Sequence, residues 1–189
     1  MVMGRIFSGL VVSFCCSVPQ AQPIDSSASK VSATFRQLGV PVQGAFKHIK
    51  GDVDFDPKRP AQAKASLEID VAGFDLGDKE YNAEVAKKEW FDAKSHPKAS
   101  FILGSVTPVN ATQYKASGSL SIKGKTANLQ FPVDIKMDSG KSVFEGKVAV
   151  NRLFFNIGEG EWKDTSLVAD EVLIQFRLVG VTPSLGVKK

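Results

Sequence analysis

Apolar and polar residues alternate with a period of two over most of the chain between Ser32 and Val181. This period is typical of antiparallel strands that bury one face and expose the other. The clearest run carries its apolar residues at Ala63, Ala65, Leu67, Ile69 and Val71, and the same register recurs over residues 114–122, 127–135, 144–150 and 172–178. Shorter strands are expected near residues 31–36 and 99–106. The pattern therefore predicts about eight antiparallel strands.

Irregularities within this pattern predict that the sheet bends. Residues 42–46 and 49–55 alternate in opposite phases, so an extra residue near Lys47 or His48 has to be absorbed. A β-bulge at that point would bend the strand. Glycines inside strands allow further bending and stand at Gly44, Gly51, Gly118 and Gly146. Because the chain shows no βαβ rhythm, we expect an all-β fold, an eight-stranded antiparallel β-barrel that is closed or nearly closed.

One segment is expected to be helical, at about residues 78–90. Asp75 or Asp78 can cap its N-terminus, and Glu84 and Lys88 are spaced for an ion pair one turn apart. The segment from Lys79 onward lacks proline and glycine until well past residue 90, and Pro97 ends any continuation. The expected architecture is therefore a barrel with a single α-helix.

The N-terminus has the three parts of a secretory signal peptide. Arg5 precedes an uncharged apolar run over residues 6–18, and Ala21 offers a small residue for cleavage. The run is too short to span a bilayer. We therefore expect residues 1–21 to be removed and residues 22–189 to form a single exported domain. Lipid modification at Cys15 or Cys16 remains an alternative, which the bulky Phe14 disfavours.

Composition narrows the range of functions. The chain of 189 residues is 43% apolar and 23% charged, as expected for an ordinary globular domain, and its net charge of +4 does not call for nucleic acid. Both cysteines lie in the expected signal peptide, so the exported domain would have no thiol, no disulfide and no cysteine metal ligand. The only histidines, His48 and His96, are not spaced to hold a metal.

Catalytic motifs are also missing from the sequence. There is no G-x-S-x-G elbow, and residues 124–126 (GKT) lack the earlier glycine and the following helix of a phosphate loop. The sequence therefore predicts no catalytic residue, no metal and no cofactor, and hence a protein that is not an enzyme.

Aromatic residues are the stronger functional lead, because several gather where strands meet loops or the helix. An eight-stranded barrel is about the size at which the interior either just fills or holds one small ligand. Arg152 is unusual among its apolar neighbours; it could extend to water, pair with an acid or meet the polar head of a bound amphiphile. The candidate ligand-binding residues are Phe35, Phe46, Trp90, Phe91, Phe101, Arg152, Phe154 and Phe155.

The order of motifs resembles the YceI-like family of periplasmic, polyisoprenoid-binding, lipocalin-like proteins. The most specific stretch reads WFD at residues 90–92, then HP at 96–97 and ASF at 99–101. Four further segments match in order, at residues 33–46, 68–77, 120–126 and 151–158. The sequence departs from the family pattern at Gln37, where many relatives carry histidine, and at Phe154, where an acidic residue is common.

The resemblance implies a lipocalin-like barrel that encloses a tunnel for a long-chain isoprenoid lipid, such as a polyprenol or an isoprenoid quinone. It implies a periplasmic binding or carrier protein without catalysis, a monomer or homodimer, with transient contact to a membrane surface or a membrane redox protein. Two alternatives stay open: an interaction module whose barrel core is filled, and an enzyme acting on lipids. An internal cavity of several hundred cubic ångströms would favour binding, and a solid interior would favour the module.

Overall fold

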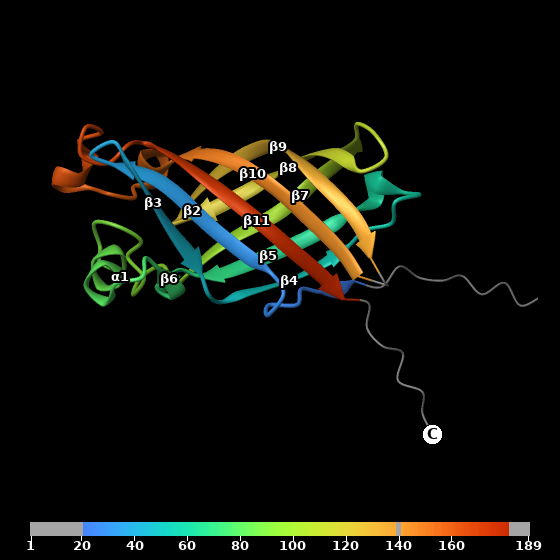
Figure 1. Ribbon diagram of the computed structural model, residues 1–189, viewed down its shortest axis with the longest axis horizontal. Coiled ribbons are helices and arrows are strands. Elements are labelled where there is room, and N and C mark those ends of the chain that lie inside the picture. The colour runs from blue at the N-terminus through green and yellow to red at the C-terminus, as the bar shows by residue number, and fades with distance from the viewer. Residues whose placement is uncertain (1–20, 139–140, 182–189) are drawn as a thin grey trace, which may run out of the picture.

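The alternating segments form the long strands of one antiparallel sheet, which curls into an elongated barrel (Figure 1). The computed structural model describes residues 21–138 and 141–181, so the expected signal peptide lies outside the described residues except for Ala21. The strands are β1 (Gln22–Pro23), β2 (Lys30–Gln37), β3 (Val40–Phe46), β4 (Ile49–Asp54), β5 (Lys64–Asp70), β6 (Phe74–Asp75), β7 (Lys98–Pro108), β8 (Gln113–Ile122), β9 (Lys125–Asp138), β10 (Lys141–Asn151) and β11 (Glu171–Val181). Their order in the sheet is β1-β4-β5-β7-β8-β9-β10-β11-β2-β3-β6.

The structure confirms the antiparallel, barrel-like fold, and its described residues form one α-helix and eleven strands rather than the eight predicted. Two of the additional strands, β1 and β6, are only two residues long. The third arises because β3 and β4 are successive pieces of one bent strand, interrupted at Lys47 and His48, where the two alternation phases meet. Since β3 pairs with β2 and β4 pairs with β5, this bent strand joins the two margins of the sheet.

The segment around Ile24 closes the remaining gap between β4 and β11. Ile24 donates its amide hydrogen to the carbonyl oxygen of Gly51 (2.9 Å) and forms a bridge with Gly180, and the amide of Asp25 donates to Val179 (2.8 Å). The barrel wall is therefore completed by the two ends of the described chain, which lie together at the end opposite α1 in Figure 1.

The α-helix within residues 21–138, α1 (Lys79–Val85), is shorter than the sequence predicted. Asp78 caps its N-terminus, and the carboxylate of Asp78 accepts hydrogen bonds from the amides of Glu80 and Tyr81. The predicted end near residue 90 is wrong, because the chain leaves the helix in tight turns after residue 86. This departure buries both Trp90 and Phe91, whereas a regular helix would point two successive side chains about 100° apart. No helix among the described residues is long and apolar enough to cross a bilayer.

The described part of the chain also contains four short 3₁₀ helices. They are η1 (Pro60–Gln62), η2 (Val71–Gly73), η3 (Arg152–Phe155) and η4 (Gly160–Lys163). The first connects β4 to β5, whereas η3 and η4 lie in the long connection between β10 and β11. This connection and α1 occupy the same end of the barrel (Figure 1).

A carboxylate fastens the segment before α1 to the bent strand. Asp75 forms an ion pair with Lys47 (Nζ to Oδ2, 2.7 Å) and accepts hydrogen bonds from the Asn82 side chain and the Gly77 amide. These contacts, of which the Lys47 hydrogen bond is the strongest, lower the pKa of Asp75 from 3.8 to about 2. The ionised carboxylate is therefore favoured by folding, because each contact is made to the charged form.

We expect this pKa to make the anchoring of α1 acid-sensitive. A pKa lowered in the folded state stabilises the protein above the unfolded value of 3.8, and this contribution is lost as the pH falls toward about 2. An NMR titration of the Asp75 carboxyl carbon should give a pKa of about 2, and Lys47→Ala should raise it. A value at or above 3.8 in the unmodified protein would contradict the anchoring role.

Candidate functional site

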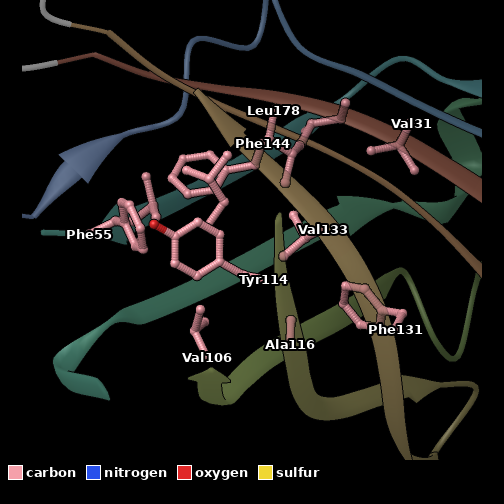
Figure 2. Packing of buried hydrophobic residues seen from close by; sticks show 12 residues of the cluster. Val31, Phe55, Val106, Tyr114, Ala116, Phe131, Val133, Phe144 and Leu178 are labelled. Atoms are coloured by element: carbon pink, nitrogen blue, oxygen red, sulfur yellow. The ribbon is translucent and has the colours of Figure 1, made fainter. Parts of the chain in front are cut away.

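The barrel interior is plugged by a group of buried aromatic side chains at each end. The tyrosine cluster consists of Phe55, Tyr114 and Phe144, whose rings meet edge to face (Figure 2); the centroid of Phe55 lies 5.4 Å from that of Tyr114 and 5.8 Å from that of Phe144. The tryptophan cluster consists of Phe74, Trp90, Phe91 and Phe155. Tyr114 stands near the start of β8, whereas Ile122 at its end packs with the tryptophan cluster. The two clusters are therefore separated by the length of a strand.

Between the clusters lies an internal cavity of about 160 Å³. Phe46, Leu129, Val148 and Ile174 pack against both buried cores, which places them in the middle of the barrel. All but one of the lining residues are apolar, Ser100 being the exception. The lining comprises Ile24, Val31, Phe46, Val53, Phe55, Ala63, Ala65, Leu67, Ile69, Ala99, Ser100, Phe101, Leu103, Val106, Ala116, Leu120, Ile122, Leu129, Phe131, Val133, Ile135, Phe144, Val148, Ile174, Phe176 and Leu178.

Two inward-facing glycines give the cavity its width. A Cβ atom at Gly118 would lie 2.4 Å from the Phe101 ring, and one at Gly146 would lie 2.5 Å from the Phe176 ring. The absence of these side chains lets both rings lie against the strand backbone. Phe131 lies between them, with its centroid 5.7 Å from each of the other two. The three rings therefore line the wall of the cavity.

Only Phe46 and Phe101 among the predicted ligand-binding residues line the cavity. Phe46 also reaches the tryptophan cluster, with its centroid 4.6 Å from that of Phe74. The remaining candidates lie elsewhere: Trp90, Phe91 and Phe155 are buried in the tryptophan cluster, Phe35 is half-buried against it, and Phe154 is 50% exposed on the outer surface. The direct ligand contacts expected of these four aromatic residues and of Phe154 stay predictions.

Most residues of the cavity lining were not among the predicted ligand-binding residues, including Leu67, Leu103, Leu129 and Phe176. The alternation pattern could have identified them, because every second residue of a barrel strand points inward, so the inward residues of one strand share one phase of the alternation. Gln37, at one of the two departures from the family pattern, is exposed, as is Phe154 at the other. These two departures therefore do not alter the cavity lining.

Arg152 is buried, and it holds together the long connection between β10 and β11. All five N–H groups of its guanidinium donate to backbone carbonyl oxygens, so no donor is left for a ligand. The acceptors are Ala169 (3.0 Å), Ile157 (2.8 Å), Gly158 (3.2 Å), Trp162 (2.6 Å) and Val168 (2.6 Å). Burial lowers the pKa of Arg152, and the nearby carboxylate of Asp170 opposes this shift. This geometry assigns Arg152 a structural role instead of the predicted contact with a head group.

A second buried cation fastens the neighbouring hairpin. The ammonium of Lys123, between β8 and β9, donates to the carbonyl oxygens of Lys88 (2.6 Å) and Asn156 (2.8 Å) and pairs with Glu159 (3.0 Å). The hydrogen bond from Lys123 lowers the pKa of Glu159. Lys123 and Arg152 therefore tie three separate chain segments over the tryptophan cluster and close that end of the barrel.

Comparisons with known proteins agree with this architecture. A UPF0312 protein of Photorhabdus laumondii subsp. laumondii is 28% identical over 127 residues, which cover 67% of this chain and 64% of the relative. The chain thus spans less than two thirds of that relative's length. The crystal structure of Burkholderia cenocepacia BcnA has a TM-score of 0.80 at 48% identity and covers 82% of this chain and 98% of BcnA.

A more distant structure shares the fold. A polyisoprenoid binding domain from Saccharophagus degradans, implicated in plant cell wall breakdown, has a TM-score of 0.70 at 15% identity, and the match covers 86% of this chain and 99% of that domain. The sequence pattern of the YceI-like domain matches residues 23–180, which is nearly the whole described structure. The chain belongs to the YceI-like family.

Proposed function

We propose that the protein is a binding or carrier protein for an isoprenoid lipid, and that the lipid's apolar tail occupies the internal cavity. The observation that carries the proposal is the lining of this cavity, which is apolar except for Ser100. A hydrocarbon tail gains about 0.8 kcal/mol for each buried CH₂, so a five-carbon isoprene unit contributes about 3–4 kcal/mol before ordering costs. Support also comes from the family and from the fold shared with a polyisoprenoid binding domain.

The size of the cavity indicates how much of a tail it takes in the present conformation. At about 160 Å³ it resembles an engineered apolar cavity of about 150 Å³ that stays dry and admits benzene. It therefore has room for a ring or about one isoprene unit. A longer tail has to displace half-buried side chains such as Phe101, Leu103 and Phe176 toward the wall, so we expect the barrel to widen on binding.

The proposed role is sequestration without catalysis. Neither acids nor bases are among the residues that line the cavity, and a tail needs none to be held. We propose that this role is performed in the bacterial periplasm, which the expected export signal supports, and that the carrier meets its lipid at a membrane surface or a membrane redox protein. Polyprenols and isoprenoid quinones are the proposed ligands. The cavity of about 160 Å³ is smaller than the several hundred cubic ångströms expected of a binding site, so the alternative, a module with a filled core, stays open and is tested by lipid uptake.

Lipid extraction from the purified protein tests this proposal. We expect solvent extracts and native mass spectrometry to show a co-purified isoprenoid lipid, and we expect delipidated protein to take up a polyprenol or quinone at one molecule per chain. Protein that carries no lipid and takes up neither probe would contradict the proposal. A fatty acid or phospholipid as the sole occupant would support lipid binding but contradict the isoprenoid class.

A further inference from the structure

We propose that the lipid tail enters the cavity through the barrel wall, at a lateral seam between β9 and β10. The seam is bounded by Pro132 and Gly146 at one end and by Lys125 and Phe154 at the other. This inference rests on the proposed function, because a portal matters only if the cavity is loaded.

The seam arises because the ladder between β9 and β10 stops while both strands continue. Only six residue pairs join them, from Lys141 opposite Asp138 to Gly146 opposite Val133. Beyond that point β9 stays paired with β8 as far as Lys125, and β10 stays paired with β11 as far as Asn151. Residues 125–132 and 147–151 thus face each other without ladder pairing.

The sequence explains where the ladder ends. The next residue of β9 is Pro132, which has no amide hydrogen to donate. Its carbonyl oxygen lies on the side of Gly146, only 2.9 Å from where a Cβ at that glycine would stand. In a strand the N–H and C=O of one residue point to the same neighbour, so the missing N–H faces β10. Pro132 therefore ends the pairing on the side where the strands diverge.

The inner face of the seam is part of the cavity. Leu129 on β9 and Val148 on β10 both line it, and both are only half-buried. Their neighbours Gln130 and Ala149 are exposed on the outer surface, as expected from alternation along a strand. A tail that passes between these two strands therefore moves from solvent directly against apolar lining residues.

Aromatic side chains and loops occupy the two ends of the barrel in this structure. The tyrosine and tryptophan clusters fill the two ends, and the buried cations Lys123 and Arg152 fasten the loops over the second. Two other ladders among the described strands stop early. Between β2 and β11, pairing ends at Thr34 and Leu173, and the chain pairs again at the bridge between Gln37 and Val168. Between β5 and β7, pairing ends at Ser66 and Ile102. There η1 packs against β7 and covers the break. At the seam between β9 and β10, η3 contacts β9 at the Lys125 end.

The end of the seam near Lys125 is held by contacts that can persist while the middle of the seam opens. The ammonium of Lys125 bonds the side chain of Asn156 (3.0 Å) and lies 5.8 Å from the centroid of the Phe154 ring. These contacts tether η3 to the first residue of β9. The strands can therefore separate in their middle, around Leu129 and Val148, while both ends of the seam stay attached.

A reversible cross-link over the seam tests the portal. The double variant Gln130→Cys/Ala149→Cys, made in a chain with Cys15→Ser and Cys16→Ser, is joined by a reductant-cleavable bis-maleimide. Stopped-flow uptake of geranylgeraniol by delipidated protein is then measured. We expect the cross-link to slow uptake at least about tenfold and cleavage to restore the original rate, as for other gated sites. The matched control is Ser119→Cys/Asn128→Cys, which bridges a fully paired position of β8 and β9 and should leave uptake unchanged.

The outcomes distinguish a failure of the proposed portal from a failure of the proposed lipid-binding function. If the cross-linked seam variant loads as fast as its cleaved form, the portal is wrong, although lipid binding stands. If both double variants slow equally on cross-linking, the effect belongs to general stiffening of the barrel, and the seam is again not the portal. If the protein without any cross-link takes up no geranylgeraniol and no quinone, the proposed function itself fails.

Discussion

Replacement of Arg152 by methionine is expected to lower the free energy of unfolding by about 4 kcal/mol, because the variant removes the donors from five backbone carbonyl groups, three of them in fully buried hydrogen bonds. Methionine keeps much of the length of the side chain, so the loss reports hydrogen bonding more than volume. Arg152→Lys should recover only part of the stability, since an ammonium offers three donors where the guanidinium uses five. Urea unfolding followed by tryptophan fluorescence measures these differences.

The matched control is Arg177→Met, which removes a guanidinium whose side chain is 46% exposed. Arg177 pairs with Glu145 and donates to Ala28, and such exposed contacts contribute little to stability. The structural role of Arg152 would be refuted if Arg152→Met unfolded at the same urea concentration as Arg177→Met. It would also be refuted if Arg152→Met kept its stability but lost lipid, because that pattern is expected of a head-group ligand.

Phe101→Asp is expected to weaken lipid binding by about a hundredfold or more, because it places a carboxylate in an otherwise apolar cavity where a bound tail would exclude water. Lys64→Asp introduces the same charge on the outer surface of a neighbouring strand and should leave binding unchanged. Competition between unmodified and variant protein for a limiting amount of polyprenol measures the ratio of affinities.

Phe101→Ala distinguishes the effect of the introduced charge from the effect of losing the contacts of the phenylalanine ring. It removes the ring but leaves the lining apolar, so a long tail should still bind, with an affinity between those of Phe101→Asp and the unmodified protein. Circular dichroism and thermal unfolding establish that each variant is folded before binding is compared. Equal lipid retention by Phe101→Asp and Lys64→Asp would indicate that the interior is a packed core and that lipid, if present, lies elsewhere.

Alternation along the chain was sufficient to predict the barrel, because each strand buries one face whichever neighbour it has. The strand count was less predictable. A phase change near Lys47 could have been a bulge within one strand or a break between two, and the structure has a break. The helix was predicted to run too far because its later residues have good helix propensity, whereas burial of Trp90 and Phe91 together requires turns.

The candidate site was harder to predict, because ring size does not show where a side chain points. Phe154 and Phe155 are adjacent and chemically alike, yet one is 50% exposed and the other 1%. Their difference is set by the short 3₁₀ helix η3, which periodicity does not reveal. Likewise, the role of Arg152 depends on carbonyl groups from residues 157–169, which gather around it only in the folded connection between β10 and β11.

The contacts that join the N-terminal segment and β2 to β11 determine when during folding the barrel interior closes. Ile24 pairs with Gly180, and β2 pairs with β11, so the wall is completed by residues about 150 positions apart in the sequence. Such long-range contacts form late, because the intervening loop has to be closed first. A chain that is synthesised from its N-terminus therefore exposes the apolar faces of β4 to β10 to water until residue 180 has been added. The addition of β11, not the completion of any single hairpin, is the step at which the lumen becomes separated from water.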